Sequence, residues 1–311
     1  MGFFAENIMK FKHKPIIVEA ELFQDSWKVT EPNGMQWILS DEEFKEKYEP
    51  CDFNWRDCHS VYINLDRRED RRIGMDKELT RVGLHAKRMK AIEVFENHNP
   101  DYSKIFNRSR GALGCFLSQL SVMEQALEFG KAAFIMEDDL VFASDVKERL
   151  DYAQKFLNKT DWDIFWLGGT YHLNPPRWHD YHHSNPELRD CDCKLARDVE
   201  ITTDARIIRT YGIWSTYAYI VNYKKLPAII DIIKKEAKNS YAIDHLFIRV
   251  QPKLKCYAFV PAMVKQYDNE TNIQGNGIMR FSEFANLGKY WFSDKMNDVN
   301  PHDINWAEAR T

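Results

Sequence analysis

The chain of 311 residues lacks several features that would assign it to a specialised class of protein. No apolar run approaches the roughly 20 residues needed to span a bilayer, and no secretory hydrophobic segment opens the chain. Six cysteines in so long a chain do not form a disulfide framework, so we expect free thiols in a reducing compartment. These absences predict a cytoplasmic protein.

An excess of basic charge is also lacking. The formal net charge of -4 gives no general footprint for nucleic acid, although it permits a local basic patch. Neither internal repeats nor a glycine-rich phosphate loop is present. Aromatic residues, in contrast, make up 14% of the chain, which indicates either a large pocket or an aromatic-rich core.

Residues 132–142, Ala-Ala-Phe-Ile-Met-Glu-Asp-Asp-Leu-Val-Phe, are the most informative stretch. The short apolar run ending at Met136 is typical of a buried strand. Three acids, Glu137, Asp138 and Asp139, follow at its carboxyl end, where like charges repel one another. A solvated acidic turn is one interpretation. We favour a divalent-metal site, because Mg²⁺ and Mn²⁺ prefer hard oxygen ligands and open α/β sheets bind ligands beyond their strand ends.

Strands and helices are expected to alternate along most of the chain. The patterns predict strands over 60–65, 86–92, 134–136, 163–167, 214–221 and 255–260, and helices over 73–82, 110–129, 144–157 and 225–237, with a further helix after Asp244. We expect a turn at Gly168-Gly169 and a long loop at about 171–210. The order predicts an α/β fold with a mainly parallel sheet.

Residues 1–52 differ in pattern from the rest of the chain and predict a small β-rich module, separate from a main domain over 59–311. Strands are expected over 14–20 and 35–39, and Ser40 is expected to cap a short helix. The segment resembles a module common among tailed-phage proteins, which implies a host-cytoplasm location if the chain is phage-encoded.

A second metal hypothesis concerns Cys191 and Cys193, with His179, His182 and His183 upstream. The spacing is CxC rather than CxxC, and no second cysteine pair follows at zinc-finger distance. We therefore interpret this segment as a polar surface loop.

Four segments in order resemble glycosyltransferase family 25, whose members include lipopolysaccharide and collagen galactosyl- or glucosyltransferases. They are Val61–Arg71, Arg110–Gln119, Ile135–Asp139 and the dispersed set of 217–221, Ile243–His245 and 261–266. Two positions depart from the family pattern. Gln119 replaces the histidine of Gly-Cys-x-x-Ser-His, and Asn272 replaces the aspartate of Ser-Asp-Ile.

The resemblance implies a GT-A fold, a Rossmann-like sheet that binds a UDP-sugar through Mn²⁺ or Mg²⁺. Asp139 is the first candidate for metal contact, followed by Asp138. Glu137 would contact the donor sugar or act as an outer-shell acid. Gln266 would contact donor or acceptor. Further candidates for donor binding are Asn64, Leu65, Arg67, Arg110 and Gly114.

Several of these residues have an alternative role. Arg68, Arg71 and Arg72 are interpreted as a solvated helix face, and only Arg67 is assigned to the donor. Gly114 either permits close approach of a phosphate or sugar or serves helix–sheet packing. Asp244 is the candidate general base of an inverting transfer, with N-capping as its rival role.

Three functions remain open. The first is transfer of glucose or galactose to a hydroxyl of a glycan or protein, or to a hydroxylated pyrimidine in phage DNA. A basic groove containing Arg177, Arg189, Lys194, Arg206 and Arg209 would support the DNA acceptor. The second is a non-catalytic glycan-binding protein built on a degenerate glycosyltransferase domain. The third, a nucleotidyltransferase, lacks a phosphate loop to support it.

Overall fold

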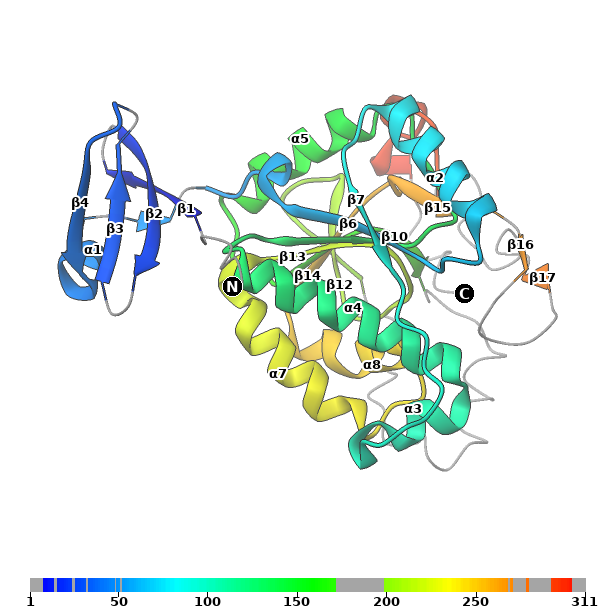
Figure 1. The fold of residues 1–311 in the computed structure, drawn as a ribbon. Helices are drawn as coiled ribbons and strands as arrows, with labels where there is room; N and C mark the ends of the chain where they lie inside the picture. Colours follow the sequence, from blue (N-terminus) through cyan, green and yellow to red (C-terminus); the bar gives the residue numbers. More distant parts are fainter. Residues whose placement is uncertain are drawn as a thin grey trace.

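The computed structural model describes residues 8–13, 16–23, 26–31, 33–47, 49–50, 52–171, 199–267, 269–270, 278–279 and 292–303. A small N-terminal sheet lies beside a larger body of sheet and helices (Figure 1). Residues 52–58 lead from the small sheet to the first strand of the larger one. Within this segment, the Trp55 indole donates to Asp151 at 2.7 Å.

The N-terminal sheet is antiparallel in the order β4-β3-β2-β1-β5. Its elements are β1 (Ile8–His13), β2 (Ile16–Phe23), β3 (Ser26–Thr30), β4 (Gln36–Ser40), α1 (Asp41–Lys47) and β5 (Glu49–Pro50). Val18, Ala20, Val29 and Phe44 form its buried core. The Ser40 hydroxyl accepts from the Glu43 backbone N–H at 3.2 Å, and Glu43 accepts from the Ser40 N–H at 3.0 Å, so the expected cap at Ser40 is a reciprocal capping box.

The main sheet has eight strands in the order β11-β12-β14-β10-β13-β8-β6-β7. In chain order they are β6 (His59–Asn64), β7 (Lys87–Lys90), β8 (Ala133–Met136), β10 (Ile164–Tyr171), β11 (Val199–Ile201), β12 (Ile207–Thr210), β13 (Ile213–Val221) and β14 (Cys256–Phe259). The pairings place β12 and β13 antiparallel to the other six strands. The predicted α/β fold with a mainly parallel, Rossmann-like sheet is therefore confirmed.

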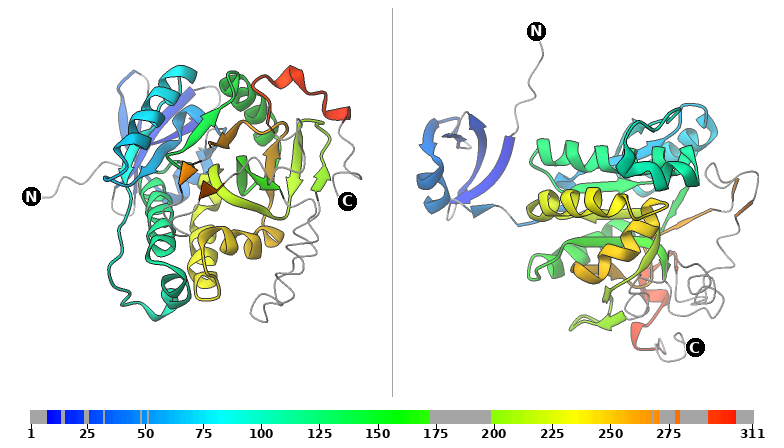
Figure 2. Two further views of the ribbon diagram at one scale, coloured as in Figure 1. Left: turned by 90° about the vertical axis from the view of Figure 1, so that its right-hand side faces the viewer. Right: turned by 90° about the horizontal axis from the view of Figure 1, so that it is seen from below.

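Helices cover both faces of this sheet (Figures 1 and 2). One face packs against α2 (Glu69–Val82) and α5 (Val146–Leu157), and the other against α4 (Arg110–Glu128), α7 (Leu226–Ala237) and α8 (Ile243–Val250). The short α3 (Ser103–Arg108) precedes α4. Ala133 and Ile135 of β8 face the α4 layer, whereas Phe134 and Met136 face the α2 layer. A strand buried on both faces needs a continuous apolar run, and β8 has one.

Two sequence expectations for the main sheet were wrong. Gly168-Gly169 is not a turn but part of β10, where the pairing with β13 shifts register. A Cβ on Gly168 would lie 2.2 Å from the Val264 carbonyl oxygen, so this glycine allows another strand to approach closely. The predicted loop at about 171–210 contains β11 and β12. Residues 172–198 lie outside the described residues, as does the whole CxC segment.

Two short ribbons complete the described structure. The strand β9 (Leu140–Phe142) pairs with β15 (Val264–Gln266), and β16 (Asn269–Glu270) pairs with β17 (Ile278–Met279). The first ribbon sets Gln266 opposite Leu140, directly beyond the three acids. Among the described helices, none is both long and apolar enough to cross a bilayer.

Candidate functional site

The three acids lie where the order of the main sheet changes direction. The chain passes from β6 through α2 to β7 on one side, then returns through α4 to β8 on the other side of β6. Open α/β sheets bind ligands at such switch points, in the crevice beyond the carboxyl ends of the strands. Asn64 ends β6 and Glu137 follows β8, so the candidate site occupies this position.

Arg71 is the cationic partner of the acids. Its Nη1 lies 2.9 Å from Asp138 Oδ1 and 3.0 Å from Asp139 Oδ2. All three residues are buried, with 7%, 7% and 4% of their surfaces exposed. Two adjacent buried carboxylates thus share the Arg71 guanidinium. The interpretation of Arg71 as part of a solvated helix face was wrong.

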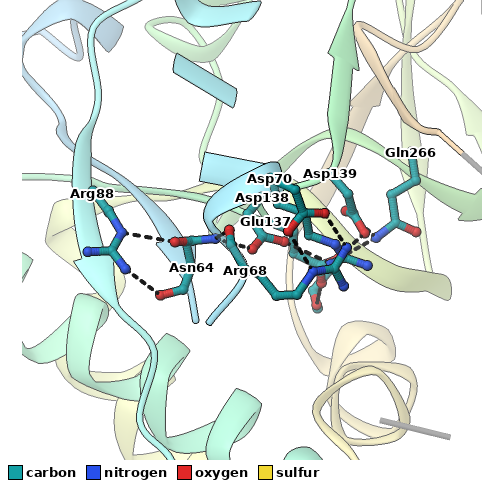
Figure 3. A network of polar contacts seen from close by, with 10 residues as sticks. Asn64, Arg68, Asp70, Arg88, Glu137, Asp138, Asp139 and Gln266 are labelled. Carbon is teal, nitrogen blue, oxygen red and sulfur yellow. Dashed lines mark hydrogen bonds and ion pairs between the residues drawn. The ribbon is translucent and has the colours of Figure 1, made fainter. Parts of the chain in front are cut away.

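Asn64 links the acids to the neighbouring strand. Its Nδ2 donates to Asp138 Oδ2 at 2.6 Å, and its Oδ1 accepts from Arg88 Nε at 2.9 Å (Figure 3). The Asn64 carbonyl accepts from the Ala91 N–H at 2.9 Å. The asparagine therefore orients Asp138 from the end of β6.

Glu137 is held by two side chains from distant parts of the chain. Gln266 Nε2 donates to Glu137 Oε2 at 2.6 Å and to Asp139 Oδ1 at 2.9 Å (Figure 3). The Thr216 hydroxyl donates to Glu137 Oε1 at 2.7 Å. Burial and the neighbouring charge of Asp139 raise the pKa of Glu137 to about 8, although the Thr216 hydrogen bond lowers it.

The oxygen atoms of Asp138, Asp139 and Gln266 suit a hard divalent cation whose remaining ligands come from a substrate. Among the described residues, no group of three or more His, Cys, Asp or Glu side chains could by itself hold a metal. Asp138 and Asp139 supply two carboxylates, and the buried Oε1 of Gln266 accepts no hydrogen bond from the part of the chain that the structure describes. Mg²⁺ is usually held by one or two carboxylates together with substrate phosphates, so these residues fit a cation completed by a diphosphate.

Three residues predicted to bind the sugar donor make their contacts away from the acids. Arg67 is exposed and pairs with Glu93. Arg110 is exposed in the first turn of α4, which Ser109 caps by accepting from the Ala112 N–H at 2.9 Å. The Leu65 carbonyl accepts from the Arg68 N–H at 2.9 Å. Among the contacts described, none joins these side chains to the acids.

Gly114 packs tightly against protein backbone. An added Cβ would lie 2.3 Å from the Ile92 carbonyl oxygen. Ser118, one turn later, donates to the Gly114 carbonyl at 2.7 Å and accepts from the Ile92 N–H at 2.8 Å. Of the two roles expected for Gly114, this geometry supports helix packing.

We expect Gly114→Ala to destabilise the protein by about 1–3 kcal/mol, because the Ile92 backbone must move to admit the methyl group. Gly74→Ala is the matched control. Gly74 is exposed within α2, and its Cβ would approach nothing closer than Tyr267 Oη at 4.0 Å, so it should gain about 0.5–1 kcal/mol from helix propensity. Urea unfolding measures both changes, and equal effects would contradict the packing role.

Asp244 lies in the first turn of α8. It does not N-cap this helix, since the N-cap is Ala242 and no side chain caps it. Burial, followed by the charge of Glu137, raises the pKa of the Cys115 thiol, and the charges of Asp244 and Asp138 raise it further. The charges of Asp244, Glu137 and Asp138 therefore act on the same thiol, that of Cys115 in α4.

Trp166 and His245 have structural roles. Trp166 is fully buried and packs against Tyr219 and Phe247. Burial lowers the pKa of His245, whose ring meets Trp214 edge to face at 4.9 Å. Asn272 lies outside the described residues.

Sequence reasoning missed Arg71 and Thr216 as members of this site. Arg71 has a recognisable signal, because it shares the buried stripe of α2 with Met75, Leu79 and Val82. A charged residue on an apolar stripe needs a buried partner of opposite charge. Thr216 carries no comparable signal.

A mainly parallel α/β sheet, layered by helices and with an acidic cluster at its switch point, is the arrangement of a Rossmann-like glycosyltransferase domain. The model of the family described as "Glycosyltransferase family 25 (LPS biosynthesis protein)" matches residues 59–247, more than half of the chain. The chain belongs to glycosyltransferase family 25.

Curated relatives match a shorter segment. Procollagen galactosyltransferase 1-A of Xenopus laevis is 32% identical over 123 residues, which are 34% of this chain and 20% of the relative. Procollagen galactosyltransferase 2 of Mus musculus is 28% identical over 124 residues, with the same shares. Inactive glycosyltransferase 25 family member 3 of Homo sapiens is 28% identical over 123 residues, 34% of this chain and 21% of the relative. The chain thus matches about a fifth of the length of these relatives.

Proposed function

We propose that the protein is a metal-dependent hexosyltransferase that moves glucose or galactose from a UDP-sugar to an acceptor hydroxyl. The observation that carries this proposal is the buried carboxylate pair of Asp138 and Asp139 at the switch point, where both side chains contact Arg71. Burying two adjacent carboxylates contributes little to folding by itself, because their desolvation offsets the gain from the ion pairs. A cation that binds together with the donor diphosphate would use both carboxylates as ligands.

In this proposal, Asp139 and Asp138 hold Mn²⁺ or Mg²⁺, with Gln266 Oε1 as a further oxygen. The cation would supply positive charge to the departing diphosphate. Glu137, held in place by Thr216 and Gln266, accepts a hydrogen bond from a hydroxyl of the donor sugar. Asn64 and Arg71 keep Asp138 in place.

Asp244 is the proposed general base of an inverting transfer. Its carboxylate takes the proton of the acceptor hydroxyl as the acceptor oxygen bonds to the anomeric carbon. The bond from that carbon to the diphosphate breaks, and its electron pair leaves with UDP. The half-buried position of Asp244 in the first turn of α8 supports this role, as does its charge, which raises the pKa of the Cys115 thiol together with the charges of Glu137 and Asp138.

The acceptor is proposed to be a hydroxyl of a glycan or a protein, as the names of the galactosyltransferase relatives suggest. A hydroxylated pyrimidine in DNA is the other proposed acceptor, and it depends on the expected basic groove. Of the basic residues expected to form a groove, Arg177, Arg189 and Lys194 lie outside the described residues. Arg206 donates to the backbone carbonyls of Met296 and Val299, at 3.0 and 3.2 Å.

A UDP-release assay with Mn²⁺ across a panel of UDP-sugars tests the donor and metal together. We expect release with one hexose donor, abolished by EDTA and restored by Mn²⁺. Adding glycan, protein or hydroxymethylated DNA acceptors should raise the rate with one acceptor class. Release that is unaffected by EDTA would contradict metal dependence.

The second candidate is a non-catalytic glycan-binding protein. Its support is the similarity to a relative described as inactive, together with the guanidinium that already neutralises part of the acidic cluster. It predicts glycan binding with no UDP release for any donor and acceptor, and no tight binding of UDP.

A further inference from the structure

A buried chain of hydrogen bonds runs from the interior of the main sheet to Glu137. The Tyr219 hydroxyl donates to Gln119 Oε1 at 2.6 Å, Gln119 Nε2 donates to Thr216 Oγ1 at 2.8 Å, and Thr216 Oγ1 donates to Glu137 Oε1 at 2.7 Å. Tyr219, Gln119 and Thr216 are only 0%, 1% and 3% exposed. In such surroundings a polar group that makes no hydrogen bond loses its full hydration free energy without compensation. The structure therefore strongly favours this arrangement of hydrogen bonds over its alternatives.

The hydrogen bonds of this network have a defined donor-to-acceptor direction. A threonine hydroxyl has a single hydrogen, and because Thr216 accepts from Gln119, that hydrogen is left for Glu137. The second amide hydrogen of Gln119 points to the Cys115 sulfur at 3.5 Å. Reversing the Gln119 amide would turn the Thr216 hydrogen toward Gln119, and Glu137 Oε1 would then face an oxygen lone pair.

The backbone of β13 is bent to place Thr216 in this chain. Ser215, the residue before it, has φ of 65°, a left-handed conformation that is rare outside glycine. The strand β10 opposite shifts register twice around Gly168. Such strain persists only where the surroundings impose it, typically at functional sites.

We propose that Gln119 is a positioning residue that, through Thr216, fixes Glu137 as a hydrogen-bond acceptor for the donor sugar. Tyr219 sets the orientation of the Gln119 amide, although Tyr219 itself does not touch the acids. This inference rests on the proposed hexosyltransferase function. It also accounts for glutamine at a family histidine position, since a neutral histidine likewise offers one acceptor and one N–H donor.

Steady-state UDP release at varied donor and acceptor concentrations tests this inference. In Thr216→Val and in Tyr219→Phe, the KM for the donor should rise about tenfold, while kcat and the KM for the acceptor stay near wild type, because a donor contact is misplaced. The conservative variants Thr216→Ser and Gln119→His should retain most of the wild-type affinity for the donor. Thr80→Val, which removes an exposed hydroxyl on α2, is the matched control and should change nothing.

The double variant Thr216→Val/Tyr219→Phe tests whether the chain acts as a unit. We expect it to raise the KM for the donor about tenfold, the same as each single variant, instead of the roughly hundredfold product expected for independent sites. Multiplicative effects, or single variants that lose thermal stability at unchanged donor KM, would overturn the positioning role and leave the transferase intact. A wild-type protein silent with every donor and acceptor would overturn the proposed function, and this inference with it.

Discussion

Replacing Arg71 with methionine is expected to destabilise the protein by about 3–5 kcal/mol, because removing one partner of a buried ion pair leaves uncompensated charge. The guanidinium lies 2.9 and 3.0 Å from two carboxylates that are almost fully buried. Methionine fills a similar volume, so the loss reflects charge rather than a cavity. Urea unfolding at neutral pH measures the difference.

Arg72→Met is the matched control on the next residue of α2. Arg72 pairs with Glu69 at the surface, with side chains 40% and 67% exposed, and such pairs contribute less than about 1 kcal/mol. In Arg71→Met, Mn²⁺ should raise the melting temperature more than in wild type, because the two acids then lack their guanidinium. A loss no greater than that of Arg72→Met would show that Arg71 does not balance the acids.

Replacing Asp139 with asparagine is expected to lower UDP release about 10³-fold while the fold is retained. Charge stabilisation of a leaving group by a bound metal contributes several kcal/mol, and each 1.36 kcal/mol is a factor of ten in rate. Folding should change by less than about 1 kcal/mol, because Arg71 and Asp138 then form a neutral pair. Initial rates with the active donor and a thermal melt separate these two quantities.

Asp151→Asn is the matched control for this prediction. Asp151 is an exposed aspartate of α5 that pairs with Arg56, and its replacement should leave the rate within twofold of wild type. Unchanged UDP release by Asp139→Asn would contradict direct contact between Asp139 and the metal or diphosphate. Unfolding of this variant would instead show that the fold requires the charge of Asp139.

Most elements of the main sheet were predictable because their burial leaves a local signature. The apolar run of β8 and the amphipathic stripe of α4 placed both elements to within a few residues. The glycines of β10 were misread because a turn and a close strand approach both require the absence of a side chain. Only the packing of Val264 against Gly168 distinguishes the two.

The position of the candidate site was predictable from the sequence, but the contacts between its side chains were not. Three acids after a buried strand indicate a ligand site at a sheet edge, and the family resemblance adds Gln266 and Asp244. The burial of Arg71 against two acids contradicts its interpretation as part of a solvated helix face, whereas the donor role of Arg67 stays a prediction. Four arginines within six residues look alike in composition, and the phase of α2 against the sheet decides which one turns inward.

The sequence by itself determined the layered α/β fold, the family and the place of the acidic cluster, because apolar periodicity and short motifs are local properties of the chain. Only the tertiary structure decided which side chains balance and orient those acids. Arg71, Thr216 and Gln266 lie 67, 79 and 129 residues from their carboxylate partners. Contacts over such separations depend on strand order, helix phase and a bend at Ser215, which no local pattern encodes.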